Sequence, residues 1–539
     1  MVIPWRAGIA KAERWPDACA VAVLAALVLI AAATFRDYGL GWDDWIQSHY
    51  GHLLVKLYSS SFTDKRAFSL DNLYMYGGGF DLLATLTSNI LPFDPYATRR
   101  LVGAVIGIVG LVAVWRLTRR LGGPLAGLIA LILLGTCPLF YGHVFINCKD
   151  APFAVVMMLA LLGIVHAIGQ YPHPRPATVA LLSIVFGLAL GTRVLGGFAI
   201  IEAVLSFLLI FAFRWRLSGL NQAASECGSF LLPFIPGVAI AYLVMGLVWP
   251  WGVAAPLNPF RALHYFSHDF VAPWRDLFDG QRISILQMPR SYVPTLLAVQ
   301  LPELMLALSL CGFAGAAVEL CRPGTDAKRR ASLFAVLLAV SLPILMTVIT
   351  LPYIFNGIRH LLFVVPPIAV LGGLAGSWIA RRLAAYGRIA IAAGAIALAA
   401  GTVSPVIDMI RLHPYEYTDF NHLVGGAKGA RQLFMLDYWG LSLTQASRGL
   451  IALLAQHHET PPNGPWKVAV CGPQSPVWVT LGPRFKLAAP QQADFALSLG
   501  EFYCAKLDAP VLLQIVRDGI VFARVYDIRG RSVAKLTVE

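Results

Sequence analysis

The sequence has few charged residues for its length. Asp, Glu, Lys and Arg make up only 13% of its 539 residues, about half the share of an ordinary globular domain. A soluble protein of this size would need a larger polar surface. The hydrophobic residues, 58% of the chain, gather in runs of about 18 to 25, long enough to cross a bilayer as helices. One run could be a signal peptide, but about eleven cannot be, so we expect a polytopic membrane protein.

The sequence also lacks the motifs of metal and nucleic-acid binding. Its eight cysteines are scattered, without a CxxC pair or a His/Cys cluster at zinc spacing, so we predict no structural metal site. The formal net charge is +13, but no RNA- or DNA-binding motif accompanies it. Lys and Arg fall mostly in short loops between apolar runs, where the positive-inside rule explains them. We therefore expect no nucleic-acid partner.

The alternation of basic loops predicts the orientation of the chain. With Arg6, Lys11 and Arg14 in the cytoplasm, every second loop is short and basic for about eleven spans. The eighth span is expected over roughly Tyr292 to Leu320, and the eleventh is expected to end near Pro405. One or two merged or missed spans is the alternative. The pattern predicts a multi-pass protein of the cell inner membrane, with a cytoplasmic N-terminus and a periplasmic C-terminal part.

The chain divides by composition into two parts. Residues 1–405 are expected to form a mainly helical membrane module with periplasmic loops 36–98, 141–151 and 249–290. Residues 406–539 lose the apolar runs, and we expect a small periplasmic α/β domain there. Its predicted elements are a helix over Ser442–Gln456, strands over Trp466–Cys471 and Ala493–Leu499, and a hairpin of Val511–Val516 and Ile520–Tyr526 about Asp518-Gly519.

Two cysteines fall in this second part. In an oxidising compartment Cys471 and Cys504 could form a disulfide. Two unpaired small residues are the equal alternative.

Two adjacent carboxylates, Asp43 and Asp44, follow the first span and are flanked by Trp42 and Trp45. The tryptophans suit the membrane interface. Either carboxylate could cap a helix that starts at Trp45. The functional alternative is a general base held in a partly dry cleft, where its pKa can approach the working pH.

The second outer loop carries an unusual group of polar residues. Between two apolar helices it reads Tyr141-Gly-His143-Val-Phe-Ile-Asn147-Cys148-Lys149-Asp150-Ala-Pro152-Phe153. Asp150 with Pro152 could simply begin the next helix. Asn147, Lys149 and Asp150 together exceed what a cap needs, and such a group is costly unless it faces a water-filled cavity. We therefore favour a functional site.

Several arginines lie on the side that the positive-inside rule leaves poor in charge. They are Arg193, Arg282, Arg290 and Arg359, the last followed by His360. Side chains that snorkel to lipid headgroups are one explanation, and for Arg290 we prefer it. Arg193 and Arg359 are flanked by apolar sequence, which favours an inward-facing site for a phosphate.

These motifs resemble those of the GT-C glycosyltransferases. The Asp-Asp pair after the first span, the Asn-x-Lys-Asp-x-Pro-Phe element and the outer C-terminal domain are similar to the bacterial branch related to protein O-mannosyltransferases and lipid A aminoarabinose transferase. The resemblance covers nearly the whole chain. Further elements that carry it are Gly191-Thr-Arg193-Val-Leu-Gly, Asn356-Gly-Ile-Arg359-His360, His413-Pro-Tyr-Glu-Tyr, Phe420-Asn, Gly425-Gly and Asp437-Tyr-Trp-Gly440.

The resemblance implies the GT-C fold and the transfer, with inversion, of one sugar from a polyprenyl-phosphate donor to an outer acceptor. That acceptor could be a lipid, a polysaccharide or a protein hydroxyl. Asp43 would be the base, with Asp44 and Asp150 assisting. Residues expected to hold the donor phosphate are Lys149, Arg193, Arg359, His360 and Arg282, and residues expected to position substrates are Asn147, His143 and Tyr76.

One element departs from the family pattern. Where the aminoarabinose transferases carry a Lys-Pro-Pro-like element, this chain reads Tyr74-Met-Tyr-Gly-Gly-Gly-Phe80-Asp81. We therefore expect a different phosphate clamp. No cofactor is expected. A divalent metal is the alternative because several carboxylates converge, but no dense cluster of oxygen ligands is evident.

Two other function classes compete with this reading. A lipid or sugar transporter would place charges near the bilayer midplane and show repeated halves. We find no convincing repeat, and the key charges lie at span ends. A membrane scaffold with an outer binding domain would not need Asp43, Asp44 and Asp150 on one face.

Overall fold

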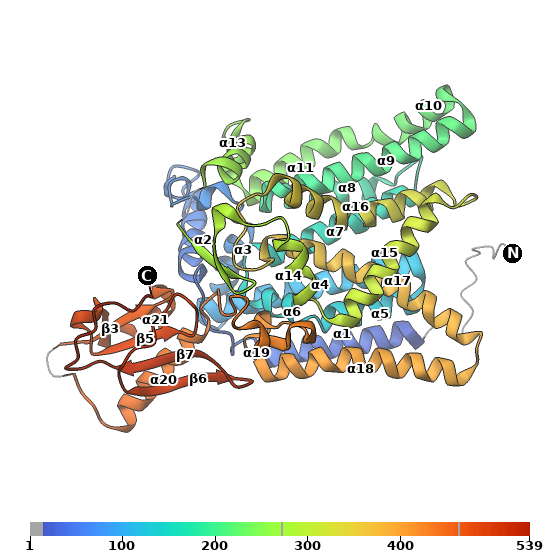
Figure 1. Ribbon diagram of the computed structural model, residues 1–539. Helices are drawn as coiled ribbons and strands as arrows, with labels where there is room; N and C mark the ends of the chain where they lie inside the picture. The colour runs from blue at the N-terminus through green and yellow to red at the C-terminus, as the bar shows by residue number, and fades with distance from the viewer. Residues whose placement is uncertain (1–14, 271–272, 462–463, 539) are drawn as a thin grey trace.

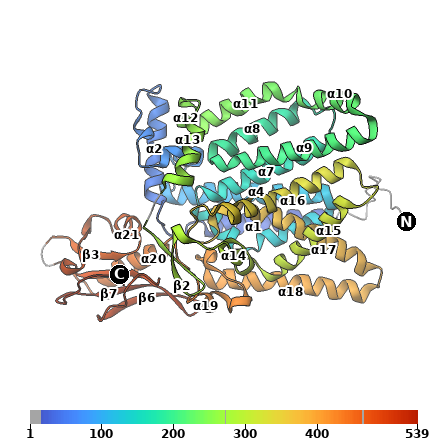
Figure 2. The ribbon, with the colours of Figure 1, turned by 45° about the horizontal axis from the view of Figure 1, so that its top comes forward.

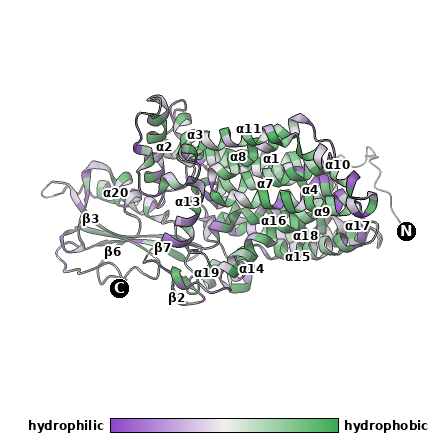
Figure 3. Cartoon of the chain, turned by 90° about the horizontal axis from the view of Figure 1, so that it is seen from above, coloured by the Kyte–Doolittle hydropathy of each residue, from purple (hydrophilic) through white to green (hydrophobic). Residues whose placement is uncertain are grey.

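A computed structural model of the chain describes residues 15–270, 273–461 and 464–538 (Figure 1). The basic residues that we used to orient the N-terminus, Arg6, Lys11 and Arg14, lie outside these residues. A long bundle of helices runs through most of the molecule, and a small α/β domain lies beyond one end of it. Hydrophobic residues predominate along the length of the bundle (Figure 3).

Within the described residues, nine helices are long and apolar enough to cross a membrane. Two shorter segments add to them: α5 (Pro124–Gly135) with α6 (Pro138–Ile146), a pair bent by 65°, and α8 (Pro176–Thr192). Each of the eleven predicted spans coincides with one of these segments, but within the described residues nine of them, or ten with the bent pair, have the length and apolarity of a membrane span. The nine are Trp15–Thr34 (α1), Pro95–Gly122 (α4), Asp150–Gly169 (α7), Val194–Ser218 (η4 and α9), Leu220–Val248 (α10 and α11), Glu303–Cys321 (α15), Ala327–Thr350 (α16), Arg359–Ala384 (η7 and α17) and Arg388–Leu412 (α18).

Two predicted helix limits differ from the structure. The eighth span is split into α14 (Tyr292–Gln300) and α15, because Pro302 forces the residue before it into an extended conformation. The last span continues through Pro405 to Leu412, since a proline removes one hydrogen bond but is tolerated in membrane helices. The last span therefore ends at Leu412 rather than near Pro405.

Shorter elements cover the end of the bundle that faces the α/β domain (Figure 2). The most important are α2 (Asp44–Ser59) and α3 (Gly79–Ser88), which follow the first span. Within the predicted loop 249–290, the structure has helices α12 (Pro250–Ala254) and α13 (Asn258–His264) and an antiparallel hairpin of β1 (Arg275–Phe278) and β2 (Gln281–Ser284).

The C-terminal domain is built on a five-stranded sheet of order β4-β3-β5-β7-β6. Strand β3 pairs in parallel with β4 and β5, and β7 pairs antiparallel with β5 and β6. The strands are β3 (Trp466–Cys471), β4 (Phe485–Leu487), β5 (Phe495–Leu499), β6 (Val511–Arg517) and β7 (Ile520–Asp527), with helices α20 (Ser442–Gln456) and α21 (Gln474–Leu481). The sequence predicted α20, β3, β5 and the hairpin but missed β4 and α21.

Two local features of this domain follow from its residues. Asp518 and Gly519 have φ angles of 45° and 74°, the left-handed conformation that a tight two-residue hairpin requires. Cys471 and Cys504 form a disulfide, which settles the alternative left open by the sequence. The hydrophobic core continues from the bundle through Tyr415 and Tyr417 into the sheet, so the two parts pack as one body.

Candidate active site

A cluster of charged side chains lies at the end of the bundle next to the C-terminal domain, where α2, α7, α8 and η7 meet. Asn147 sets the geometry at the start of α7: its Oδ1 accepts hydrogen bonds from the backbone N–H of Lys149 (3.1 Å) and of Asp150 (2.8 Å). Asn147 therefore satisfies the free amides at this helix start. Its Nδ2 donates to Asp150 Oδ2 at 2.9 Å. This hydrogen bond fixes the orientation of the Asp150 carboxylate.

Two arginines converge on Asp150. Arg193, at the end of α8, forms an ion pair with its Oδ1. Arg359, at the start of η7, has its Nη1 4.0 Å from Asp150 Oδ2 and 4.0 Å from Asp43 Oδ2. Asp150 is only 2% exposed. The buried carboxylate thus orients both guanidinium groups, one of which also reaches Asp43.

Lys149 is the third cation of the cluster. Its Nζ lies 3.5 Å from Asp43 Oδ2 and 4.9 Å from the centre of the Tyr76 ring. The amide of Gln47, oriented with its nitrogen toward Asp81, accepts from Lys149 Nζ at 2.7 Å and donates to Asp81 Oδ2 at 2.6 Å. Burial alone would lower the pKa of Lys149, but the charge of Asp43 holds that pKa above its ordinary value. Lys149 is therefore a fixed positive charge.

The cluster has more positive than negative charge. Three cations, Lys149, Arg193 and Arg359, surround two carboxylates, Asp43 and Asp150. The Nε atoms of both arginines are buried without a hydrogen-bond partner among the described residues. Such a surplus of desolvated cations is the complement of an anion, and paired guanidinium groups suit a phosphate.

Asp43 is far more exposed than Asp150 or the adjacent Asp44. Its side chain is 27% exposed, against 2% for Asp150 and 2% for Asp44. Asp43 stands at the residue before α2 but makes no capping hydrogen bond. A substrate hydroxyl can therefore reach this carboxylate, and capping does not account for it.

Asp44 has a different place. Its two oxygens accept hydrogen bonds from Arg100 Nη1 and Nη2, at 2.7 and 2.6 Å, and one also accepts from the backbone N–H of Gly41 at 2.7 Å. Asp81 accepts a single hydrogen bond from Arg99, from Nη2 to Oδ1 at 2.5 Å. Burial raises the pKa of Asp81 even though Arg99 opposes the shift. Both carboxylates are buried in ion pairs with arginines, so neither is open to a substrate, and Asp44 supports Asp43 from inside the bundle.

His143 and His360 lie on either side of Asp150 in the chain but have different surroundings. His143 is fully buried; its Nδ1 accepts from Asn147 Nδ2 at 3.2 Å, so its Nε2 is left to donate to Tyr438 Oη at 2.9 Å. His143 therefore links the second outer loop to the C-terminal domain. The Nδ1 of His360 is buried without a hydrogen-bond partner within the described residues, and its ring packs edge-on against Phe355 at 4.9 Å.

The departure from the Lys-Pro-Pro pattern has a structural counterpart. A Cβ on Gly77 would lie 1.4 Å from the backbone oxygen of Gly191, so only glycine allows this segment to pack on the end of α8. The same packing holds the Tyr76 ring 5.6 Å from the Arg193 guanidinium. Burial raises the pKa of Tyr76, against the opposing charges of Lys149 and Arg193. Tyr76 thus remains a neutral hydroxyl beside the cations.

Arg282 takes another place. It lies on β2, where its guanidinium faces the Phe502 ring at 5.7 Å and its Nη2 donates to the Phe502 oxygen at 3.3 Å. These contacts join the hairpin to the C-terminal domain. Arg282 is therefore not included in the phosphate site that we propose below.

The C-terminal domain contributes a residue that sequence reasoning missed. The backbone N–H of Trp42 donates to the Trp439 oxygen at 3.1 Å, and a Cβ on Gly41 would lie 1.8 Å from Trp439 Cδ1. The Trp439 ring is 4.9 Å from the Arg359 guanidinium. Trp439 therefore covers the cluster. Its only sequence signal was the Asp437-Tyr-Trp-Gly440 element; Gln47, also missed, had none.

The carboxylates do not gather as metal ligands do. Over the described part of the chain, no group of three or more His, Cys, Asp or Glu side chains could hold a metal ion. Asp43 and Asp150 share the cation Arg359 between them instead.

Comparison with known proteins adds a family match over part of the chain. Residues 80–240 match the family model described as dolichyl-phosphate-mannose-protein mannosyltransferase. At the level of sequence, no curated protein matches the chain.

Solved structures extend the comparison to almost the whole chain. The apo crystal structure of ArnT from Cupriavidus metallidurans matches 96% of this chain and 98% of its own, at 14% identity and a TM-score of 0.51. The structure of the same protein bound to undecaprenyl phosphate matches 95% of this chain and 98% of its own, at 14% identity and a TM-score of 0.50. The oligosaccharyltransferase of Archaeoglobus fulgidus matches 88% of this chain at 15% identity and a TM-score of 0.48, and the chain spans 65% of its length.

At such low identity the structural matches establish the fold. Nearly complete coverage of both chains by ArnT means that the helix bundle and the outer domain are arranged alike. The family match falls in the part of the bundle that supplies Lys149, Asp150 and Arg193. The chain thus shares the fold of ArnT, and the fold that the resemblance implied is confirmed.

Proposed function

We propose that this protein is a membrane glycosyltransferase that moves a single sugar from a polyprenyl-phosphate donor to an acceptor hydroxyl outside the cytoplasm. One observation carries the proposal. A partly exposed carboxylate, Asp43, lies 3.5 Å from Lys149 and 4.0 Å from Arg359 in a cluster with a surplus of positive charge. A base beside a phosphate-binding group is the pair that this reaction needs.

The reaction step follows from this pair. The acceptor oxygen attacks the anomeric carbon and its proton passes to Asp43, while the bond from that carbon to the phosphate oxygen breaks. The electron pair of the broken bond leaves with polyprenyl phosphate. Attack from the face opposite the phosphate inverts the anomeric centre. A positioned general base contributes about 10²- to 10⁴-fold to such a step.

The cations have a matching role. Negative charge grows on the leaving phosphate oxygen, and preorganised donors in a dry site stabilise it. Arg193 and Arg359 are held by Asp150, and Lys149 is held by Asp43 and Gln47. Lys149, Arg193 and Arg359 would bind the phosphate, with His360 behind them. Asn147, His143 and Tyr76 would fix the positions of these groups.

Two further observations support a lipid-linked donor. The fold is shared with ArnT, a protein crystallised with undecaprenyl phosphate. The cluster also lies at the ends of apolar helices, where the phosphate of a membrane-embedded lipid would be found. We propose the inner membrane as the location, with the cluster and the C-terminal domain in the periplasm.

The test is direct. Purified full-length protein in lipid nanodiscs is incubated with a panel of polyprenyl-phosphate sugars, and release of polyprenyl phosphate is followed by mass spectrometry. We expect release from at least one donor, and NMR of the product should show an inverted anomeric centre. A transporter or a scaffold would leave every donor intact, and that result would reject the proposal.

A further inference from the structure

Exposed aromatic side chains from both parts of the molecule meet beside Asp43. Trp42 and Trp45, on either side of the acidic pair, are 48% and 38% exposed, and Trp478 of α21 is 43% exposed. The rings of Trp45 and Trp478 are 5.6 Å apart at 70°. The ring of His49 stacks on Trp45 at 5.8 Å and 4°. An open aromatic corner thus begins two residues from the proposed base.

Helix α21 extends this corner away from the bundle. Gln474 and Trp478 are four residues apart and both exposed, while Pro476 and Val477 between them are buried. Residues at this spacing share one face of a helix, about 6 Å apart along its axis. Gln474 therefore continues the surface that starts at Trp45 and Trp478.

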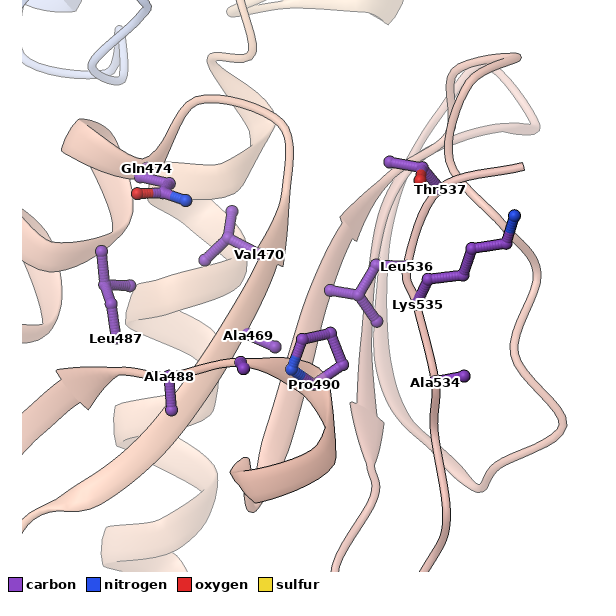
Figure 4. Close-up of a pocket in the computed structure, with 11 residues that line it drawn as sticks. Ala469, Val470, Gln474, Leu487, Ala488, Pro490, Ala534, Lys535, Leu536 and Thr537 are labelled. Carbon is purple, nitrogen blue, oxygen red and sulfur yellow. The ribbon is translucent and has the colours of Figure 1, made fainter. Parts of the chain in front are cut away.

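Gln474 also lines a cavity of about 500 Å³ in the C-terminal domain (Figure 4). The cavity adjoins strands β3 and β4 near their carboxyl ends, the edge at which parallel sheets bind ligands. Figure 4 shows Gln474 and Thr537 on opposite sides, with Val470, Leu536 and Pro490 between them. Its volume lies in the usual range of about 300 to 1,000 Å³ for small-molecule sites.

The outer wall of the cavity is tied to the sheet. The chain near the C-terminus forms it, and there the Leu536 oxygen accepts from the Ala505 N–H at 2.7 Å. Its neighbour Cys504 is bonded to Cys471 at the end of β3. The disulfide therefore joins both walls, and the cavity is a built feature of the domain.

We propose that the aromatic corner of Trp45 and Trp478, the α21 face and this cavity form one binding surface for a glycan acceptor. The inference rests on the proposed function and narrows it: the acceptor hydroxyl belongs to a sugar of an oligosaccharide. The terminal sugar stacks on Trp45 and Trp478 with its hydroxyl at Asp43. The next sugars follow Gln474 into the cavity.

The chemistry of the surface favours a glycan over other occupants. The C–H faces of a sugar ring carry partial positive charge and pack on the negative face of an indole. The cavity offers aliphatic walls for such faces and the Gln474 amide for hydroxyl groups. A surface for lipid would be apolar throughout, yet His49 and Gln474 interrupt it. Figure 1 also places α21 beyond the end of the bundle, away from the membrane-spanning helices.

The test uses the full chain in nanodiscs and saturation-transfer NMR with neutral hexasaccharides of several linkages. A threonine-containing peptide is the competing probe. We expect saturation of sugar C–H protons from at least one hexasaccharide. Trp45→Ala or Trp478→Ala should raise the dissociation constant about three- to tenfold. Trp478→Phe should retain most of the affinity, and Trp478→Leu should not.

Controls separate this inference from the proposed function. Trp378→Ala removes a tryptophan that is 55% exposed on a membrane helix. It should leave the dissociation constant of the hexasaccharide unchanged. Release of polyprenyl phosphate to water by the unmodified protein is measured without any hexasaccharide, so that the proposed function is tested apart from acceptor binding. If the unmodified protein releases no polyprenyl phosphate from any donor, the proposed function is rejected, whereas binding of a hexasaccharide is judged by the NMR experiment. Three results would overturn the glycan surface. The first is that no hexasaccharide binds, and the second is that Trp45→Ala and Trp478→Ala both bind as the unmodified protein does. The third is saturation of the peptide or of lipid in place of the sugar.

Discussion

Two layers of charge lie at the end of the bundle next to the C-terminal domain, and they are built in opposite ways. In the inner layer, Asp44 with Arg100 and Asp81 with Arg99 form one-to-one pairs at 2.6 and 2.5 Å, with side chains at most 3% exposed. In the outer layer, Asp43 lies 3.5 and 4.0 Å from two cations and is 27% exposed. Burial closes the inner pairs to a ligand, whereas the outer layer is partly open and has a surplus of positive charge.

The difference explains why two adjacent aspartates have different roles. Asp44 is the first residue of α2 and points into the bundle toward Arg100, while Asp43 precedes the helix and stays at the surface. The buried pair of Asp44 and Arg100 holds the start of α2 in place, and the position of α2 determines where the Asp43 carboxylate lies. This division predicts that the two layers respond differently to mutation, in stability for one and in activity for the other.

The largest expected effect is on the inner layer. Asp44→Asn leaves Arg100 as an unpaired buried charge, which should lower the free energy of unfolding by about 3 to 5 kcal/mol. Thermal unfolding in nanodiscs measures it. Asp64→Asn is the control, because the partner Arg66 is 63% exposed and such pairs contribute at most about 1 kcal/mol. Equal melting temperatures for the two variants would mean that the inner layer does not support the fold.

A smaller effect is expected for a cation of the outer layer. Lys149→Gln removes one charged contact to the phosphate, which is worth about 1.5 to 3 kcal/mol. The kcat/KM for the donor should fall about 10- to 100-fold with little change in melting temperature. Lys65→Gln, on the exposed part of the same outer end, is the control. Unchanged donor kinetics in Lys149→Gln would remove this residue from the phosphate site.

The smallest effect concerns the junction of the two parts. His413 faces Glu416 Oε1 at 2.6 Å and Asp37 Oδ2 at 3.1 Å. Burial opposes its charge, but hydrogen bonds to the two carboxylates outweigh burial and raise the pKa of His413. The stabilisation is therefore complete below its ordinary value of about 6.5 and is lost as pH rises through the raised value.

A variant tests this sign. His413→Gln should lower the melting temperature at pH 6 and have a smaller effect at pH 8.5, because the charge of the imidazole in the unmodified protein declines as pH rises through its raised pKa. A larger loss at pH 8.5 than at pH 6 would contradict the assignment.

Much of this architecture could be predicted from the sequence, because it depends on local patterns. The spans follow from apolar runs, and α20, β3 and the hairpin at Asp518-Gly519 follow from periodicity and turn residues. The charged residues of the outer loops could be picked out because charge beside apolar helices is costly. Their pairing could not. Nothing in the adjacent Asp43 and Asp44 says which carboxylate meets an arginine at position 100.

The parts that were missed depend on contacts between distant segments. Trp439 reaches the cluster because Gly41 leaves room for its ring. Gln47 matters because α2 turns it toward Lys149 and Asp81. Arg282 carried the same sequence signal as Arg193, yet β2 places it against Phe502. The sequence therefore identifies candidate site residues, but only the fold shows which of them contact the charged cluster.

The comparison of the two layers is tested most directly by Asp43→Asn. Melting temperature and release of polyprenyl phosphate are measured on the same preparation in nanodiscs. We predict a melting temperature within a few degrees of the unmodified protein and a rate of transfer lower by about 10²- to 10⁴-fold. Normal transfer by a well-folded Asp43→Asn protein would contradict the role of Asp43 as base and with it the functional meaning of the outer layer.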